Sequence, residues 1–196
     1  MTVPSYTRDV VALPVLRSLR LCAAEQFGLA GRVPCRFPIT WGTSPPPADA
    51  CDCRCDIAGQ GQAWVRWVST APANMGAGAG ECADGTYEIT VELGVYRCWP
   101  IPERGPLDEG EEELAAMGML LDAAAIRRAF ACCPDLDEYQ SWELTSEEPM
   151  ERQGGCTGVT AQARVIVSDC NCGDPYWLPQ TVQQHVDKLS GERPIA

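Results

Sequence analysis

The segment from residue 86 to residue 98 alternates between apolar and polar side chains. Its apolar positions are Tyr87, Ile89, Val91, Leu93 and Val95, and the positions between them are Glu88, Thr90, Glu92 and Gly94. Because successive side chains of a strand point to opposite faces of a sheet, this alternation predicts a strand with one buried face and one wet face. Such a strand needs a covering layer on its apolar face only, which is typical of antiparallel sheets.

Four other segments have the composition of strands, namely residues 35–41, 62–70, 139–143 and 159–168. Pro38 interrupts the first of them, which predicts an edge strand or a bulge, because proline cannot donate a hydrogen bond to a ladder.

Two tryptophans of the 62–70 segment stand at an odd offset. Trp64 and Trp67 must therefore face opposite sides of the sheet. One of them needs cover from a loop, a neighbouring element or another subunit, and aromatic residues are favoured at assembly interfaces.

Residues 8–27 carry apolar side chains at three- and four-residue spacing, which predicts a first helix. Thr7 is its expected N-cap, and Gly28 with Gly31 its expected stop. Pro14 suits only the first turn of a helix, so the regular helix is expected to begin close to it.

Residues 108–131 predict a second helix, which Pro134 ends. Glutamates lie in its first turns and arginines in its last, a distribution that the helix dipole favours. Its expected buried stripe consists of Leu114, Met117, Leu121 and Ala125.

The order of these elements predicts the fold class. A helix, three strands, a helix and two strands indicate an α+β fold, in which two helices pack on one face of an antiparallel sheet of about four to five strands. Residues 1–168 are expected to form a single domain. The patterns stop at residue 169, so residues 169–196 are interpreted as an extended C-terminal arm.

The charge of the chain argues against recognition of nucleic acid. There are 27 acidic and 15 basic residues, for a net charge of −12, and no run of arginine or lysine. Proteins that grip phosphates need a basic face. No apolar run approaches the roughly 20 residues of a membrane span. The first residues lack the pattern of a secretory signal, which predicts synthesis in the cytosol and no membrane partner.

The sequence offers little to a catalytic mechanism. The only histidine is His185, in the predicted arm, and a histidine-activated nucleophile would have to use it. No phosphate-binding or dinucleotide-binding glycine motif occurs. Glu111, Glu112 and Glu113 could act as paired carboxylates, but acids at a helix N-terminus are the simpler account. We therefore expect no enzyme, no catalytic residue and no cofactor.

Twelve cysteines allow three readings. In an extended chain, Cys51, Cys53 and Cys55 would present three thiolates on one side, and Cys82 or Cys35 would complete a zinc site, although no C-x-x-C spacing supports one. Free thiols that behave as small hydrophobes are a second reading. The third is disulfides within or between subunits, formed after the protein leaves the cell. The candidates are Cys35, Cys51, Cys53, Cys55, Cys82, Cys98, Cys132, Cys133, Cys156, Cys170 and Cys172.

Five short motifs, in order along residues 8–167, carry a family likeness. They are Val33-Pro34-Cys35-Arg36, Gly61-Gln62-Ala63-Trp64-Val65-Arg66, Val91-Glu92-Leu93-Gly94-Val95-Tyr96-Arg97-Cys98, Arg127-Arg128-Ala129 leading to Cys132-Cys133, and Gly154-Gly155-Cys156. In these motifs the chain resembles a Cys-rich family of head–tail connector (neck) proteins from tailed phages of actinobacteria.

Within such a connector, the order of helices and strands is similar to that of tail terminators. The resemblance implies a virion structural protein that forms a hexameric ring with its own copies, ends the tail tube and joins it to the head. Implied partners are the tail tube protein and the stopper or adaptor proteins below the portal. Genomic DNA would pass through the bore without sequence-specific binding, and assembly would take place in the host cytoplasm.

An acidic bore would repel DNA and let it pass. Glu88 and Glu92, on the expected wet face of their strand, are the candidate lumen acids. Two alternatives remain open at this point. One is another neck component, stopper or adaptor, and the other is a zinc-binding regulatory protein.

Overall fold

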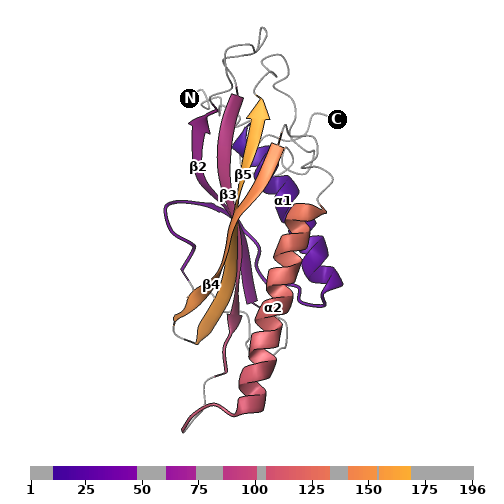
Figure 1. The fold of residues 1–196 in the computed structure, drawn as a ribbon, viewed down its shortest axis with the longest axis vertical. Coiled ribbons are helices and arrows are strands. Elements are labelled where there is room, and N and C mark those ends of the chain that lie inside the picture. The colour runs from indigo at the N-terminus through magenta and orange to yellow at the C-terminus, as the bar shows by residue number, and fades with distance from the viewer. Residues whose placement is uncertain are drawn as a thin grey trace, which may run out of the picture. The chain divides into compact units, whose positions relative to one another are not determined.

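The alternating segment forms the central strand of a five-stranded sheet (Figure 1). The computed structural model describes residues 11–47, 61–73, 86–100, 105–132, 141–153 and 155–168, and all of its elements belong to one compact unit, Asp9–Asp169. The elements are α1 (Ala12–Leu29), β1 (Ile39–Trp41), β2 (Gly61–Pro72), β3 (Thr86–Cys98), α2 (Glu109–Ala131), β4 (Ser141–Gln153) and β5 (Cys156–Ser168). The predicted α+β class is confirmed. The predicted arm, with His185, lies outside the described residues.

The strands lie in the order β1-β2-β3-β5-β4, and the sheet is mixed. β2, β3, β5 and β4 pair antiparallel, as predicted, whereas β1 pairs with β2 in parallel. Parallel neighbours need a crossover connection of a dozen or more residues, and the chain between β1 and β2 is long enough to provide it. The first strand is also shorter than predicted. Arg36 contributes only an isolated bridge to Gln62, and Pro38 follows it.

The outer antiparallel strand β4 extends well beyond its predicted end at Glu143. It runs to Gln153 and forms a hairpin with β5. Its middle is rich in glutamate and contains Pro149, which hides the strand from a propensity argument. Proline is tolerated there because β4 is an edge strand. Two register shifts, at Leu144/Ser146 and Met150/Gln153, interrupt the pairing.

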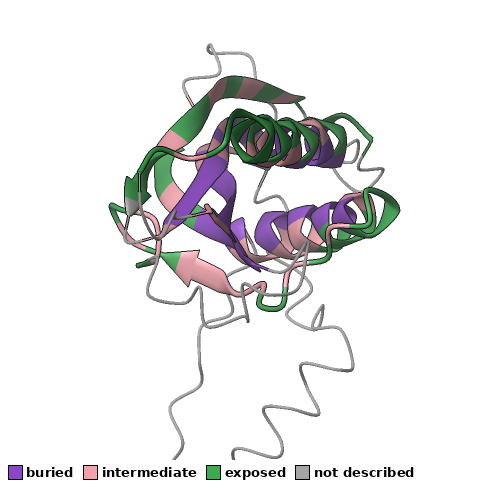
Figure 2. Cartoon of the chain, turned by 90° about the horizontal axis from the view of Figure 1, so that it is seen from below, coloured by how far each residue is buried: buried purple, intermediate pink, exposed green. Residues whose placement is uncertain are grey.

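Both helices cover the same face of the sheet, as predicted (Figure 2). Their buried sides meet the apolar side of the strands, and together they form one core. Phe27 of α1 packs edge-on to Phe37, and Phe130 of α2 stacks on Trp142 of β4.

Helix α1 begins later than its periodicity indicated. Its N-cap is Val11, so the expectation that Thr7 caps the helix is wrong. Pro14 is the third helical residue, where a backbone N–H would lack an intrahelical acceptor in any case. Of the two glycines of the predicted stop, Gly28 lies inside the helix and Gly31 is confirmed, because it adopts a φ of 66° and the N–H of Arg32 donates back to the carbonyl of Phe27.

Helix α2 has the predicted bounds. The Asp108 side chain accepts a hydrogen bond from the N–H of Gly110, and acids fill the first turn. The buried residues of α2, however, are Asp122, Ala123, Ala125, Ile126, Ala129 and Phe130. The predicted stripe therefore holds only at Ala125, and its three larger members are exposed.

The face of β3 that was expected to be exposed to water is buried over part of its length. Glu92, Gly94 and Tyr96 are buried there, and Trp64 of β2 lies across them. The Trp64 ring is tilted by 37° to that of Tyr96, and the ring centroids lie 4.6 Å apart. A Cβ added to Gly94 would lie 2.2 Å from Cζ2 of Trp64, so the ring requires a glycine beneath it.

Candidate assembly surface

The first half of α2 exposes a row of large apolar side chains. Leu114 is 71% exposed and Leu120 67%, and Met117 and Leu121 are exposed by more than half. The three- and four-residue spacing correctly predicted that these side chains share one side of α2. The prediction that this side is buried was wrong. Burial begins only at Asp122, and Figure 1 shows α2 continuing past the end of α1. No core element of the described chain therefore covers these side chains.

Glutamates accompany this apolar row. Glu109, Glu111, Glu112 and Glu113 are exposed in the first turns of α2. Glu112 lies 3.9 Å from Arg152 of β4. Both side chains are more than half exposed, so this ion pair contributes little to the stability of the fold. These acids stabilise the N-terminus of the helix through its dipole, as the sequence indicated.

Helix α1 also exposes apolar side chains, together with two arginines and the exposed Glu25. Leu21 is 63% exposed, and Leu29 is similarly exposed, as is Val33 in the segment that follows the helix. Arg17 and Arg20 lie on the same side of α1 as Leu21, one turn or less away. Partial burial and the neighbouring Arg20 lower the pKa of Arg17, which indicates that the two guanidinium groups repel each other.

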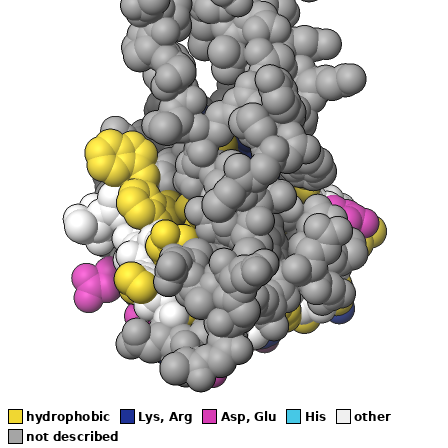
Figure 3. Space-filling model, turned by 90° about the horizontal axis from the view of Figure 1, so that it is seen from above, with side chains coloured by type: hydrophobic (Ala, Val, Ile, Leu, Met, Phe, Trp, Pro, Cys, Tyr) yellow, Lys and Arg dark blue, Asp and Glu magenta, His cyan; other side chains and the backbone are white. Residues whose placement is uncertain are grey.

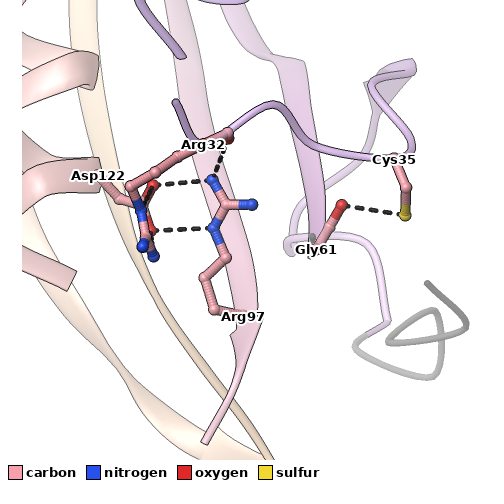
Figure 4. A network of polar contacts seen from close by, with 5 residues as sticks. All are labelled: Arg32, Cys35, Gly61, Arg97 and Asp122. Carbon is pink, nitrogen blue, oxygen red and sulfur yellow. Dashed lines mark hydrogen bonds and ion pairs between the residues drawn. The ribbon is translucent and has the colours of Figure 1, made fainter. Parts of the chain in front are cut away.

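A buried carboxylate fixes α2 against the rest of the protein (Figure 4). Asp122 accepts two hydrogen bonds from Arg97 of β3, at 2.8 and 3.0 Å, and two from Arg32, at 2.8 and 2.9 Å. Arg97 also donates to the carbonyl of Arg32 at 2.7 Å. One side chain of α2 thus joins the central strand and the segment that follows α1.

The segment that follows α1 is held to β2 as well. The N–H of Cys35 donates to the carbonyl of Gly61, and the Cys35 Sγ lies 3.2 Å from the same oxygen. Because Cys35 is disulfide-bonded, its sulfur has no proton to donate. We therefore regard this sulfur contact as packing.

The candidate lumen acids have different environments. Glu92 is only 1% exposed, so its expected wet position is wrong. Its carboxylate accepts from Arg66 twice, from Trp64 Nε1 at 2.9 Å and from Gln162 at 3.1 Å. Arg66 in turn donates to the carbonyl of Gly42. Burial pulls the pKa of Glu92 upward, but the hydrogen bonds outweigh burial and the pKa is lowered.

Glu88 is half-buried and lies 3.7 Å from Arg164 of β5. The alternating pattern could not predict that Glu92 is fully buried and Glu88 is not, because the arginine that pairs with Glu92 comes from another strand.

The free edge at β1 carries two tryptophans. Trp41 and Trp67 are register partners across β1 and β2. Trp41 is 81% exposed, while Trp67 is partly exposed and donates through Nε1 to the Thr70 hydroxyl. Trp64 and Trp67 face opposite sides, as predicted. Seen from above, hydrophobic side chains gather on the side of the molecule where β2 lies in Figure 1 (Figure 3).

The structure supports part of the disulfide prediction. Cys35, Cys98 and Cys156 are disulfide-bonded, and so is Cys22, which the sequence gave no reason to include. Cys132 is a free, exposed thiol, so it forms no disulfide within the chain, and a bond between subunits stays a prediction. The other candidate cysteines lie outside the described residues: Cys51, Cys53, Cys55, Cys82, Cys133, Cys170 and Cys172.

The proposed zinc site cannot include Cys35, because a disulfide sulfur is not a thiolate ligand. The other zinc candidates, Cys51, Cys53, Cys55 and Cys82, are among the residues that are not described. Within the described ranges, no group of three or more histidine, cysteine or acidic side chains could hold a metal ion.

Neither a family model nor a curated protein matches the chain. Among the helices that the structure describes, none is long and apolar enough to cross a membrane.

Proposed function

We propose that this chain is a structural subunit of the head–tail connection of a tailed phage. In this proposal its copies form a ring, hexameric by likeness to tail terminators, that ends the tail tube and joins it to the head. The five sequence motifs that resemble the connector family suggest the particle. The order of helices and strands favours the terminator within it.

The observation that carries the proposal is the exposed apolar row on α2. Leu114, Met117, Leu120 and Leu121 occupy consecutive turns of one well-formed helix. Isolated exposed leucines are ordinary on protein surfaces, but a contiguous row of large apolar side chains is typical of an interface. A subunit whose work is to assemble needs such a surface.

The rigid joint at Asp122 supports the same proposal. The apolar row ends one residue before Asp122, whose carboxylate is bound by arginines from two other parts of the fold. The helix therefore presents its apolar side chains on a fixed support, and interfaces bind more tightly when their contact groups are already in place.

The bore of the proposed ring needs a revised set of acids. Glu92 is buried and paired, so we no longer assign it to the bore. Glu88 remains a candidate, although Arg164 offsets part of its charge. The net charge of −12 suits a channel through which DNA passes without adhering.

Electron microscopy of the assembled phage neck tests the proposal. We expect this chain in a six-fold ring directly on the tail tube. A position in a twelve-fold ring against the portal, or in a separate ring above the tube end, would make it an adaptor or a stopper. Absence of the chain from the particle would refute the structural role.

A genetic experiment tests the terminator function separately. Deleting the gene should yield tails of uncontrolled length that lack heads, because nothing halts growth of the tube. Tails of normal length without heads would retain the neck assignment and reject the terminator. Supplying the wild-type chain from a plasmid is the control and should restore infectious particles.

A further inference from the structure

Two exposed helical surfaces of this protein are complementary to each other. We define the α2 patch as Glu109, Glu113, Leu114, Met117 and Leu120, and the α1 patch as Arg17, Arg20, Leu21, Ala24 and Gly28. The α2 patch combines apolar side chains with acidic ones, whereas the α1 patch combines them with Arg17 and Arg20, and the exposed Glu25 of α1 lies beside it. Both patches lie in the helix layer, on the side away from the sheet.

The α2 patch has the geometry of a helix–helix contact. Glu113, Met117 and Leu120 follow one another at four- and three-residue spacing, and Leu114 flanks them. Residues at these spacings form one ridge on the surface of a helix. The ridge is apolar in the middle and acidic toward the start of α2.

The α1 patch contains small side chains, against which such a ridge can pack. Ala24 and Gly28 are exposed one turn apart, and a Cβ added to Gly28 would meet nothing within 4 Å. Small residues let a second helix approach closely. Leu21 supplies apolar contact on this surface, and Arg17 with Arg20 supplies the positive charge. Their mutual repulsion is relieved by an acidic partner.

Pairing of like patches is less favourable. Two α1 patches would bring four arginines together. Two α2 patches in antiparallel arrangement would set the glutamates of each helix against Arg127 and Arg128 of the other. Arg127, however, already forms an ion pair with Glu147 of β4. Contact between an α1 patch and an α2 patch brings opposite charges together without breaking the Arg127–Glu147 ion pair.

We propose that the α2 patch of one copy docks on the α1 patch of the next copy, and that this head-to-tail contact is the one that builds the ring. The inference rests on the proposed function. A contact between two different patches leaves one patch free at each end, so it continues until the chain of copies closes. A twofold contact would stop at two copies.

Charge reversal in the full-length protein tests this contact. Variant A carries Arg17→Glu and Arg20→Glu, and variant B carries Glu109→Arg and Glu113→Arg. The oligomeric state is measured by sedimentation velocity and native mass spectrometry. Each variant alone should associate at least about tenfold more weakly than wild type, because like charges meet at every contact.

Mixing the two variants in equal amounts is the decisive step. In a ring that alternates A and B, every contact again joins opposite charges, so the mixture should recover the wild-type oligomer. A matched control with Glu148→Arg and Glu151→Arg changes two exposed acids of β4 and should associate like wild type. Circular dichroism establishes that all variants remain folded.

Each contrary result has a distinct meaning. A wild-type chain that stays monomeric at every concentration would overturn the inference, since the patches would then have another occupant. Variant A associating like wild type would overturn it in favour of a twofold α2 contact, and a mixture that fails to recover would also overturn it. If the reversal pattern holds but microscopy finds no such ring in the neck, the contact stands and the proposed function fails.

Discussion

Asp122 and Arg97 form a buried two-point ion pair that joins α2 to the central strand of the sheet. Both side chains are almost completely inaccessible to solvent, and Arg32 completes the cluster from its more open side. Breaking a buried pair by removing one partner leaves an uncompensated charge, which costs about 3–5 kcal/mol. Together with the equally buried Arg66–Glu92 pair, this joint should therefore give the largest responses to single substitutions at charged positions.

We expect Asp122→Ala to lower the free energy of unfolding by about 3–5 kcal/mol, because two arginines then lose their shared carboxylate. Chemical denaturation followed by circular dichroism measures the change. Arg127→Ala is the control, since the Arg127 side chain is half exposed to water and its ion pair with Glu147 should be worth about 0–1 kcal/mol. Equal losses in the two variants would contradict the structural role assigned to Asp122.

Gly94→Ala should destabilise the protein by about 1–3 kcal/mol through overpacking against the Trp64 ring. Trp64→Leu removes that ring, so Gly94→Ala should cost clearly less in the Trp64→Leu background. The coupling is read from a double-mutant cycle of unfolding free energies. Additive effects would mean that the ring does not limit position 94.

The stability of the protein should fall in acid because of Glu92. Its pKa is lowered in the folded state below the ordinary value of 4.5. A lowered pKa stabilises the fold above the unfolded-state value, and this contribution is lost as the pH falls through the folded value. Unfolding free energies measured from pH 6 downward should therefore decline below about pH 4.5.

Glu92→Gln tests the origin of that decline. The variant should be less stable than wild type near neutral pH, with a shallower dependence on acid. Glu148→Gln makes the same change in charge at an exposed position of β4 and separates the effect of Glu92 from that of net charge. An unchanged slope in Glu92→Gln would show that other groups govern the acid response.

Thiol labelling should distinguish the cysteines. In the native protein a thiol reagent should modify Cys132 without prior reduction, whereas Cys22, Cys35, Cys98 and Cys156 should react only after reduction. Peptide mass spectrometry assigns the labelled positions. Reduction should also lower the thermal midpoint, since loss of a disulfide typically costs about 2–5 kcal/mol. Cys132→Ser should leave the thermal midpoint unchanged, and a large shift in that variant would contradict its assignment as free.

Sequence periodicity predicted the elements that are regular over many residues. The bounds of β3 and α2 agree with the alternation of residues 86–98 and with Asp108 as the cap of α2. Local sequence was less informative where pairing decides the structure. β4 is a strand because β5 lies beside it, and its glutamates and Pro149 give little strand propensity of their own.

The candidate surface was missed for a related reason. The spacing of Leu114, Met117 and Leu121 shows that they share a side of α2, but it does not show what lies opposite that side. Likewise, nothing near Glu92 in the sequence identifies Arg66 as its partner, because the two residues meet only when β2 pairs with β3. Burial at these positions is a property of the assembled sheet.

The joint at Asp122 has a mechanical consequence. A push or pull applied to the exposed half of α2 is not absorbed by bending of that helix alone. It is carried through the carboxylate into Arg97, on the strand that is hydrogen-bonded on both sides, and into Arg32, at the end of α1. Load applied to that half of the helix would thus be shared with the sheet and with the segment after α1 through this joint.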